Sequence, residues 1–211
     1  MKVRCVIFDS DGTLVDSERL AMALLVKMTA ENGISLPLAE TTQEFSGVRL
    51  HRVIASIEER FNTQLPEQFI PEYRVRLAAD LEKHLQPMPG IRTVLHSLLL
   101  PCCIASNAPL EKLRLCLSAT GLDSYFNDEI YSAYEVGSWK PEPGLFLAAA
   151  QGMGYSPGEC AVVEDSVPGI RAGLDAGMTV IAYRQVQRLD PRVLHIEHHD
   201  ELAPLLKELS A

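Results

Sequence analysis

Positive charge is scarce in this sequence. Its 211 residues include 19 Lys and Arg against 28 Asp and Glu, so the formal net charge at neutral pH is −9. A protein with this balance lacks the basic field that attracts phosphate backbones, which argues against a nucleic-acid partner. A small anionic substrate is still compatible with the sequence, because a local cluster of positive charge can oppose the overall balance.

The cysteines show neither a disulfide framework nor zinc-type spacing. They are odd in number, and most of them lie in apolar runs, which predicts buried and reduced thiols in a cytoplasmic protein. No histidine stands next to any of them, so a catalytic cysteine is not expected. The five cysteines are Cys5, Cys102, Cys103, Cys116 and Cys160.

Long hydrophobic runs are also missing. The most apolar stretch, residues 94–105, is too short to cross a bilayer and contains Pro101. The first residues form a strand-like run rather than a signal-peptide pattern, and the chain has no internal repeat. We therefore expect no membrane partner, while 47% apolar residues are enough to build a buried core.

Short apolar runs that alternate with helical patterns predict an α/β fold. Helical patterns at 109–119, 143–153 and 167–176 separate the later runs. This alternation predicts right-handed crossovers, and hence a Rossmann-like parallel sheet with helices on both faces. The five predicted strands are residues 3–8, 102–106, 129–132, 160–164 and 179–183.

A long segment after the first strand breaks the alternation. Residues 15–86 contain no convincing strand. The Pro- and Gly-containing stretch at 86–90 is expected to form a stiff linker that returns the chain to the core. We predict an all-helical cap domain here, inserted into a discontinuous core made of residues 1–14 and 87–211. Two connections between the domains would allow hinge closure. The predicted cap helices are residues 17–32, 47–60 and 71–85.

Two carboxylates at the end of the first strand form the most informative motif. The run Val3–Phe8 stops at Asp9 and Asp11, which Gly12 and Thr13 follow. Side chains alternate along an extended chain, so the two carboxylates start on one face, roughly 7 Å apart. Such a pair is unfavourable unless a cation or proton lies between its members. The end of a buried parallel strand is also where open α/β sheets bind ligands, which predicts a divalent-metal site that carries a nucleophile.

Other polar residues are predicted to meet at the same edge of the sheet. Ser106 and Asn107 end the second strand, Lys140 precedes a helix, and Glu164 and Asp165 end the fourth strand. Acids, a lysine and a hydroxyl in one crevice suit phosphoryl transfer. A metal can orient phosphate oxygens, a carboxylate can attack phosphorus, and a lysine and a hydroxyl can stabilise the transferred group.

In their order and spacing, these motifs resemble those of the haloacid dehalogenase-like hydrolases, over nearly the whole chain. The helical insertion is similar to the cap of the β-phosphoglucomutase-like branch. The resemblance implies a Mg²⁺-dependent phosphatase for a small phosphorylated metabolite, most simply a sugar phosphate. The tryptophan before Lys140, Trp139, resembles the one found at this place in family members that act on 6-phosphogluconate. The matching motifs are Asp-x-Asp-Gly-Thr at 9–13, Ser106-Asn107, Lys140-Pro141 and Glu164-Asp165.

The resemblance implies roles for the acidic residues. Asp9 would be the nucleophile and a metal ligand. Asp11 would protonate the leaving oxygen and then activate water, and its main-chain carbonyl would bind Mg²⁺. Asp165 would be a further metal ligand. Its neighbour Glu164 would point elsewhere in an extended chain and act on the metal through water.

The resemblance also implies residues that bind the substrate. We expect the enzyme to be a monomer. Ser106 and Lys140 would hold the phosphoryl oxygens, with help from Asn107, and Lys140 would offset the charge of the nucleophile. In the cap, Ser46-Gly47-Val48-Arg49 resembles a substrate-specificity loop. Gly47 and Arg49 are the candidate contacts there, and the Arg49 guanidinium could bind a second anionic group in bidentate fashion.

Three other functions deserve comparison. A phosphosugar mutase of the same fold has valine where Thr13 stands and a histidine in the first cap helix, which is absent here, so transfer to water is favoured. A dehalogenase lacks the second aspartate, so Asp11 argues against one. A phospho-accepting signalling domain would leave no place for the helical insertion.

The histidines near the C-terminus could suggest a metal site, but their spacing matches no standard zinc pattern. They are His195, His198 and His199.

Overall fold

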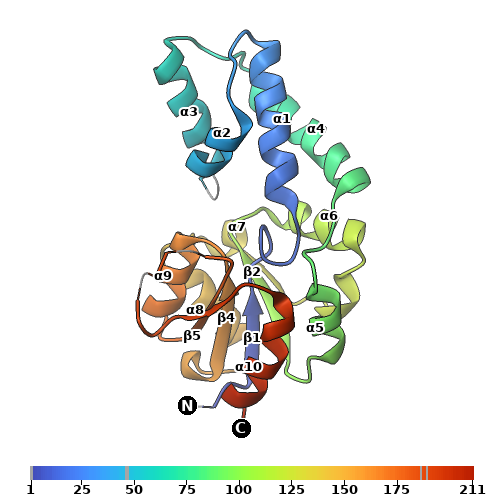
Figure 1. Cartoon of the computed structure of the whole chain (residues 1–211), viewed down its shortest axis with the longest axis vertical. Coiled ribbons are helices and arrows are strands. Elements are labelled where there is room, and N and C mark those ends of the chain that lie inside the picture. The colour runs from blue at the N-terminus through green and yellow to red at the C-terminus, as the bar shows by residue number, and fades with distance from the viewer. Residues whose placement is uncertain (1, 46–47, 186, 189) are drawn as a thin grey trace. The chain divides into compact units, whose positions relative to one another are not determined.

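The chain forms two compact units, which are described separately here. The computed structural model describes all residues except 1, 46, 47, 186 and 189. The larger unit comprises Met1–Asp16 and Gln86–Ala211, and the smaller unit is Ser17–Leu85. Figure 1 shows that the larger unit holds the labelled strands, while the smaller one shows only helices.

A six-stranded parallel sheet forms the larger unit. Its strand order is β3-β2-β1-β4-β5-β6, so β1 lies inside the sheet between β2 and β4. Every neighbouring pair is parallel, which confirms the predicted fold class. The strands are β1 (Cys5–Phe8), β2 (Cys102–Ser106), β3 (Ile130–Ser132), β4 (Cys160–Glu164), β5 (Thr179–Tyr183) and β6 (Leu194–Ile196).

The sixth strand is absent from the sequence-based prediction. β6 has three residues, Leu-His-Ile, and pairs with β5 alone at the edge of the sheet. A run this short has no apolar stretch or alternation that would separate it from a loop. The four longer strands, β1, β2, β4 and β5, need no such context, because their burial on both faces selects near-continuous apolar residues. β3 also has only three residues, and it was predicted as part of the run 129–132.

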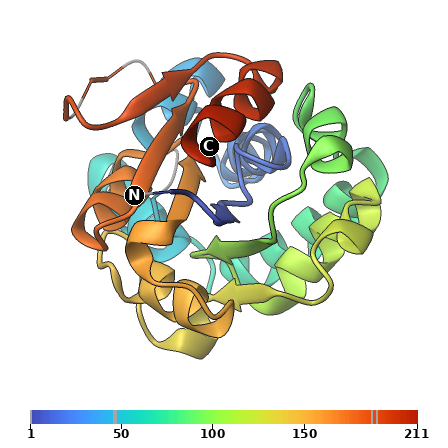
Figure 2. The ribbon, with the colours of Figure 1, turned by 90° about the horizontal axis from the view of Figure 1, so that it is seen from below.

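Helices cover both faces of this sheet, as Figure 2 shows for the larger unit. On one face, α8 and α9 pack over the middle strands, with a core that includes Ile7, Val162 and Phe146. On the other face, the ring of Phe8 meets Phe126 edge to face at 6.2 Å between centroids. The helices of this unit are α5 (Ile91–Ser97), α6 (Leu110–Thr120), α7 (Ala133–Val136), α8 (Gly144–Gly152), α9 (Val167–Asp175) and α10 (Leu202–Leu209).

Local signals set the ends of the helices near the sheet edge. Ser166 caps α9, since its side chain accepts a hydrogen bond from the amide of Gly169. α6 ends at Gly121, which adopts a left-handed conformation with φ 60°. These two helices therefore begin directly after β4 and β2, at the carboxyl edge of the sheet. Short 3₁₀ turns occupy Asp123–Tyr125, Pro157–Glu159 and His199–Glu201.

The smaller unit is a helical bundle with a core of its own. Its buried side chains include Leu25, Met28, Ile57 and Phe69. The structure adds α2 to the three helices predicted from sequence, and α3 begins three residues later than predicted. The helices are α1 (Ser17–Glu31), α2 (Leu38–Phe45), α3 (Leu50–Phe61) and α4 (Phe69–His84).

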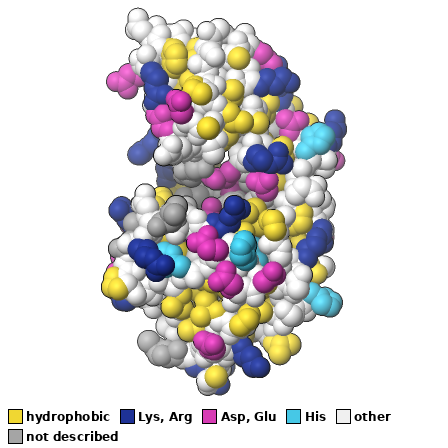
Figure 3. Space-filling view, in the orientation of Figure 1, with side chains coloured by type: hydrophobic (Ala, Val, Ile, Leu, Met, Phe, Trp, Pro, Cys, Tyr) yellow, Lys and Arg dark blue, Asp and Glu magenta, His cyan; other side chains and the backbone are white. Residues whose placement is uncertain are grey.

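The surface and the thiols agree with the composition. Acidic, basic and hydrophobic side chains are interspersed on the face visible in Figure 3. All five cysteines are free, and four of them are buried. Within the described part of the chain, no helix has both the length and the apolar character needed to cross a membrane.

His199 is buried inside the larger unit, although it belongs to the C-terminal histidine group. Its imidazole stacks on the ring of Tyr183 at 4.0 Å between centroids, and its Nε2 lies 2.8 Å from the main-chain oxygen of Thr13. Burial lowers the pKa of His199 from 6.5 to about 4, despite the opposing effect of the hydrogen bond to Thr13. The folded protein therefore favours the neutral imidazole.

We predict that His199 makes the fold sensitive to mild acid. Because the folded pKa lies below the unfolded pKa of 6.5, the stabilisation is complete above pH 6.5 and is lost as the pH falls toward 4. Between pH 7.5 and 4.5, wild type should lose roughly 2–3 kcal/mol more unfolding free energy than His199→Gln. Urea denaturation at both pH values measures this difference. His96→Gln, at an exposed histidine of α5, is the control and should lose as much as wild type; equal losses in all three proteins would contradict the prediction.

Candidate active site

The polar motifs meet at the carboxyl edge of the parallel sheet. Asp9 follows β1, Ser106 ends β2, and Glu164 ends β4. The chain builds β2 and β3 on one side of β1 and then crosses to build β4 on the other side. Ligands of open α/β sheets bind at such a reversal of strand order, outside the carboxyl ends of the strands.

A buried lysine connects two of these carboxylates. The Nζ of Lys140 donates to Asp9 Oδ1 at 2.5 Å and to Glu164 Oε2 at 2.7 Å, and only 3% of the lysine side chain is exposed. The ammonium also lies 4.7 Å from the ring centroid of Phe146. Lys140 is thus not the solvated residue that an isolated lysine in a loop would suggest.

Burial and charge act in opposite directions on this pair. Burial, followed by the charge of Glu164, raises the pKa of Asp9 to about 7, although Lys140 opposes the shift. Burial lowers the pKa of Lys140, but the charges and hydrogen bonds of Asp9 and Glu164 outweigh it, and the net pKa is raised. One ammonium does not fully compensate the carboxylates around Asp9, so the site favours a further cation.

The position of Glu164 differs from the sequence-based expectation. Strand alternation predicted that Glu164 would point away from Asp165, but the carboxylate lies in the site. Its Oε1 accepts hydrogen bonds from the main-chain amides of Asp165 and Ser166. The alternation ends because β4 stops at Glu164 and the chain turns into α9, so Asp165 no longer belongs to the strand.

Asp165 is held by residues from two other segments. Thr13 Oγ1 donates to Asp165 Oδ1 at 3.0 Å, and Gln185 Nε2 donates to the Asp165 carbonyl at 2.9 Å. Gly12 has φ 82°, and a Cβ built on it would lie 2.2 Å from Asp165 Oδ2. The glycine of the Asp-x-Asp-Gly-Thr motif therefore provides both the turn and the space for this carboxylate.

Asp11 contacts a lysine that the sequence did not single out. Lys112 Nζ lies 2.8 Å from both carboxylate oxygens of Asp11. The two side chains are 27% and 23% exposed, respectively. Asp11 is therefore less buried than Asp9 and has a lysine beside it, while its charge still helps to raise the pKa of Asp9.

Ser106 and Asn107 have different roles in the structure. The buried Ser106 hydroxyl accepts a hydrogen bond from the amide of Ala108. Asn107 binds the main chain of Lys140 on both sides, because its Oδ1 accepts from the Lys140 amide at 2.9 Å and its Nδ2 donates to the Lys140 carbonyl at 3.2 Å. Asn107 thereby fixes the loop from which the lysine enters the site.

One set of side chains is arranged to hold a cation. Among the described residues, Asp9, Glu164 and Asp165 form the only group of three acidic, His or Cys side chains whose ligand atoms lie within 4.8 Å of one another. Two members are buried, and all three donors are carboxylate oxygens. This donor set fits a hard divalent cation rather than a soft transition metal.

The candidate residues in the cap lie in the smaller unit. Gly47 and the preceding Ser46 are outside the described residues. Arg49 is exposed and directly precedes α3, with φ −60° and ψ 131°. The structure thus places Arg49 at the start of a helix, and its role in substrate binding remains a prediction.

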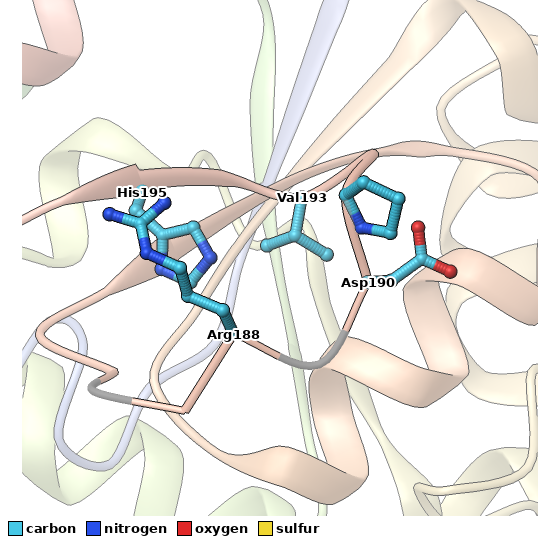
Figure 4. Close-up of a pocket in the computed structure, with 5 residues that line it drawn as sticks. Arg188, Asp190, Val193 and His195 are labelled. Atoms are coloured by element: carbon cyan, nitrogen blue, oxygen red, sulfur yellow. The ribbon is translucent and has the colours of Figure 1, made fainter.

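The C-terminal histidines do not gather at one point. His195 lines a surface hollow of about 460 Å³ together with Arg188, Asp190 and Val193 (Figure 4). His198 is exposed, whereas His199 is buried against Tyr183. None of the three belongs to the group of possible metal ligands found among the described residues. This hollow does not include the carboxylates at the sheet edge.

Sequence reasoning missed several residues that touch the site. Lys112 is the third residue of α6, and the start of that helix directly after β2 could have placed it at the same edge. Thr13 was recognised as part of the Asp-x-Asp-Gly-Thr motif and as a departure from the mutase pattern, but its contact with Asp165 was not predicted. The contacts of Gln185 and His199 depend on the path of the chain around β5 and β6, and no local pattern indicates them.

We predict that Lys140→Met destabilises the protein strongly. The substitution keeps most of the side-chain volume but leaves Asp9 and Glu164 buried together without a cation. In EDTA, urea denaturation should show a loss of roughly 3–5 kcal/mol. Arg4→Met provides the control, since it breaks an ion pair with Glu159 in which the arginine is 60% exposed; its loss should stay below about 1 kcal/mol. Equal losses of unfolding free energy in the two variants would show that the buried ion pair contributes no more stability than the exposed one.

Comparison with known proteins agrees with this geometry. Residues 3–177 match the haloacid dehalogenase-like hydrolases. The chain is 32% identical to the 6-phosphogluconate phosphatase of Escherichia coli strain K12, over 98% of this chain and 96% of that protein. A crystal structure of a family hydrolase from Deinococcus radiodurans R1, with bound phosphate and sodium, superposes with a TM-score of 0.80 at 31% identity, over 99% of this chain and 96% of that one.

The fold is also similar to that of a β-phosphoglucomutase from Clostridium difficile. The TM-score is 0.81 at 21% identity, over 99% of this chain and 97% of that one. At this identity the likeness concerns the fold alone. The family match, the full-length relative and the parallel sheet lead to one conclusion: the chain belongs to the haloacid dehalogenase-like hydrolases and is a phosphatase of that family.

Proposed function

We propose that this phosphatase hydrolyses a small sugar phosphate in a Mg²⁺-dependent reaction, through a phosphoaspartate at Asp9. One observation carries the proposal. The Asp9 carboxylate lies at the end of β1, 2.5 Å from the Lys140 ammonium and within 4.8 Å of the carboxylate of Asp165. A carboxylate nucleophile beside a lysine and a candidate metal ligand suits phosphoryl transfer.

In the first half-reaction, an oxygen of Asp9 attacks phosphorus. A bond forms between this oxygen and phosphorus while the bond from phosphorus to the sugar oxygen breaks. Asp11 donates a proton to the leaving sugar oxygen, which departs as an alcohol. Lys140 and Ser106 stabilise the oxygens of the transferring group, since both lie at the ends of strands or loops that meet beside Asp9.

In the second half-reaction, water attacks the phosphoaspartate. Asp11, now a carboxylate, accepts a proton from the water while the water oxygen bonds to phosphorus. The bond between phosphorus and the Asp9 oxygen breaks, which regenerates the Asp9 carboxylate and releases phosphate. Asp11 thus acts first as an acid and then as a base. Its place in the chain, two residues after Asp9, suits both roles.

The acidic cluster supports the choice of cofactor. We propose that Asp9, Asp165 and the main-chain carbonyl of Asp11 hold Mg²⁺, with Glu164 acting through water because its oxygens already contact Lys140 and two amides. Bound Mg²⁺ would supply positive charge that offsets the phosphate oxygens. This charge matters here, because a phosphate dianion would otherwise approach a site that is already rich in carboxylates.

The similarity to a 6-phosphogluconate phosphatase supports a sugar phosphate as substrate. We propose 6-phosphogluconate as the first compound to test, because its carboxylate offers the second anionic group that Arg49 is expected to bind. A mutase reaction is the main competing function, and the fold alone does not separate the two. The product does, since a phosphatase releases inorganic phosphate and a mutase returns an isomeric sugar phosphate.

We expect Mg²⁺-dependent release of phosphate that Asp9→Asn abolishes. The amide cannot form the acyl phosphate, so kcat should fall by at least about 10³-fold. The measurement is a phosphate-release assay over sugar phosphates, 6-phosphogluconate, nucleotides and phosphoglycolate, with Mg²⁺ or with EDTA. Asp11→Asn should remain folded and show weak turnover.

Circular dichroism of each variant controls for folding. Retained turnover in Asp9→Asn would remove Asp9 from the nucleophile role. Full activity in EDTA would contradict the proposed metal. An isomeric sugar phosphate without phosphate release would favour the mutase reaction.

Arg49→Ala is predicted to raise KM more than it lowers kcat for an acidic sugar phosphate. Removal of a contact made equally in the ground state and the transition state weakens binding without slowing the chemical step. Steady-state kinetics on 6-phosphogluconate measure both constants, and a neutral hexose phosphate serves as the control substrate. An unchanged KM on the acidic substrate would count against Arg49.

A further inference from the structure

Lys112 makes a contact with Asp11 that is less exposed than a neighbouring ion pair on the same helix. It lies on α6 and places Nζ 2.8 Å from both carboxylate oxygens of Asp11, 101 residues away in the chain. Two positions further along the same helix, Arg114 pairs with Asp128 at 3.0 Å, with side chains that are 55% and 79% exposed. The Lys112 and Asp11 side chains are only 27% and 23% exposed.

The framework around this contact is rigid on both sides. Lys112 belongs to the first turn of α6, whose buried side chains Leu113, Cys116 and Leu117 anchor the helix in the core. Asp11 follows β1 in a turn that Gly12 shapes with φ 82°. The Asp11 side chain has two rotatable bonds, so contact of both its carboxylate oxygens with Nζ of a lysine on an anchored helix restricts its orientation.

The two lysines of the site contact different carboxylates. Lys140 donates to Asp9 and Glu164, whereas Lys112 donates to Asp11. Asp11 still contributes to the field at Asp9, since its charge is among the causes that raise the pKa of Asp9. Lys112 therefore places a positive charge beside the candidate acid–base group.

We propose that Lys112 is a positioning residue, which holds the Asp11 carboxylate in the orientation needed for proton transfer to and from the reacting oxygens. This inference rests on the proposed function, because it assigns Lys112 a part in the chemistry through Asp11. A correctly placed group for proton transfer typically contributes 10²–10⁴-fold to rate. Loss of its orientation should remove a share of that factor.

The test is a double-mutant cycle on phosphate release. Lys112→Met should lower kcat by roughly 10-fold or more while KM changes less than about 3-fold, since Lys112 acts on the chemical step. Lys112→Arg should recover part of the loss because it keeps the charge. In the Asp11→Asn background, Lys112→Met should have no further effect on kcat, since the group that it positions is already gone.

Arg114→Met on the same helix is the matched control and should stay within about 2-fold of wild type. Full additivity of Lys112→Met and Asp11→Asn would overturn the inference, as would an unchanged kcat in Lys112→Met. A rise in KM alone would mean that Lys112 binds substrate instead, and would overturn it too.

A second measurement separates this inference from the proposed function. If wild type hydrolyses no phosphate ester, the proposed function fails. The shifts in urea midpoint caused by Lys112→Met and Asp11→Asn then test the contact on its own. A double-mutant shift smaller than the sum of the two single shifts supports the Lys112–Asp11 coupling. A shift equal to the sum overturns it.

Discussion

The rest of the site depends on the contact of the Lys140 ammonium with the carboxylates of Asp9 and Glu164. The ammonium is almost fully buried, so its charge and those of its partners act with little screening by water. Asn107 fixes the main chain of Lys140 on both sides, and Glu164 is in turn held by the amides at the start of α9. The position of Asp9 is thus tied to three segments of the larger unit.

The excess of negative charge at the site explains why its carboxylates require cations beside them. Four carboxylates gather at the sheet edge, and two lysines oppose them. Lys140 lies between the buried Asp9 and Glu164, and Lys112 lies beside the more exposed Asp11. The remaining negative charge favours a divalent cation, and only such a cation would make the site attractive to a phosphate dianion. Under the proposed function, metal binding and substrate binding are coupled by electrostatics.

Much of the fold could be predicted because its signals are local. The buried strands are apolar runs, and the helices that follow them begin with residues such as Ser166 and end at glycines such as Gly121. Short elements were missed: β6 has only three residues, and α2, α5 and α10 lack a long periodic pattern. At the site, strand ends brought Asp9, Ser106 and Lys140 toward one edge as expected, whereas the orientation of Glu164 was wrong because its strand ends there.

The sequence by itself determined the parallel sheet and the edge at which the Asp-x-Asp-Gly-Thr motif lies, since burial and strand alternation act over a few neighbouring residues. Only the tertiary structure decided which charges are partners. Lys112 reaches Asp11 because α6 follows β2, the neighbour of β1 in the sheet. His199 is buried while His198 is exposed because the last 3₁₀ turn packs against Tyr183. These contacts join residues far apart in the chain, and their partners are set by how elements pack rather than by any local pattern.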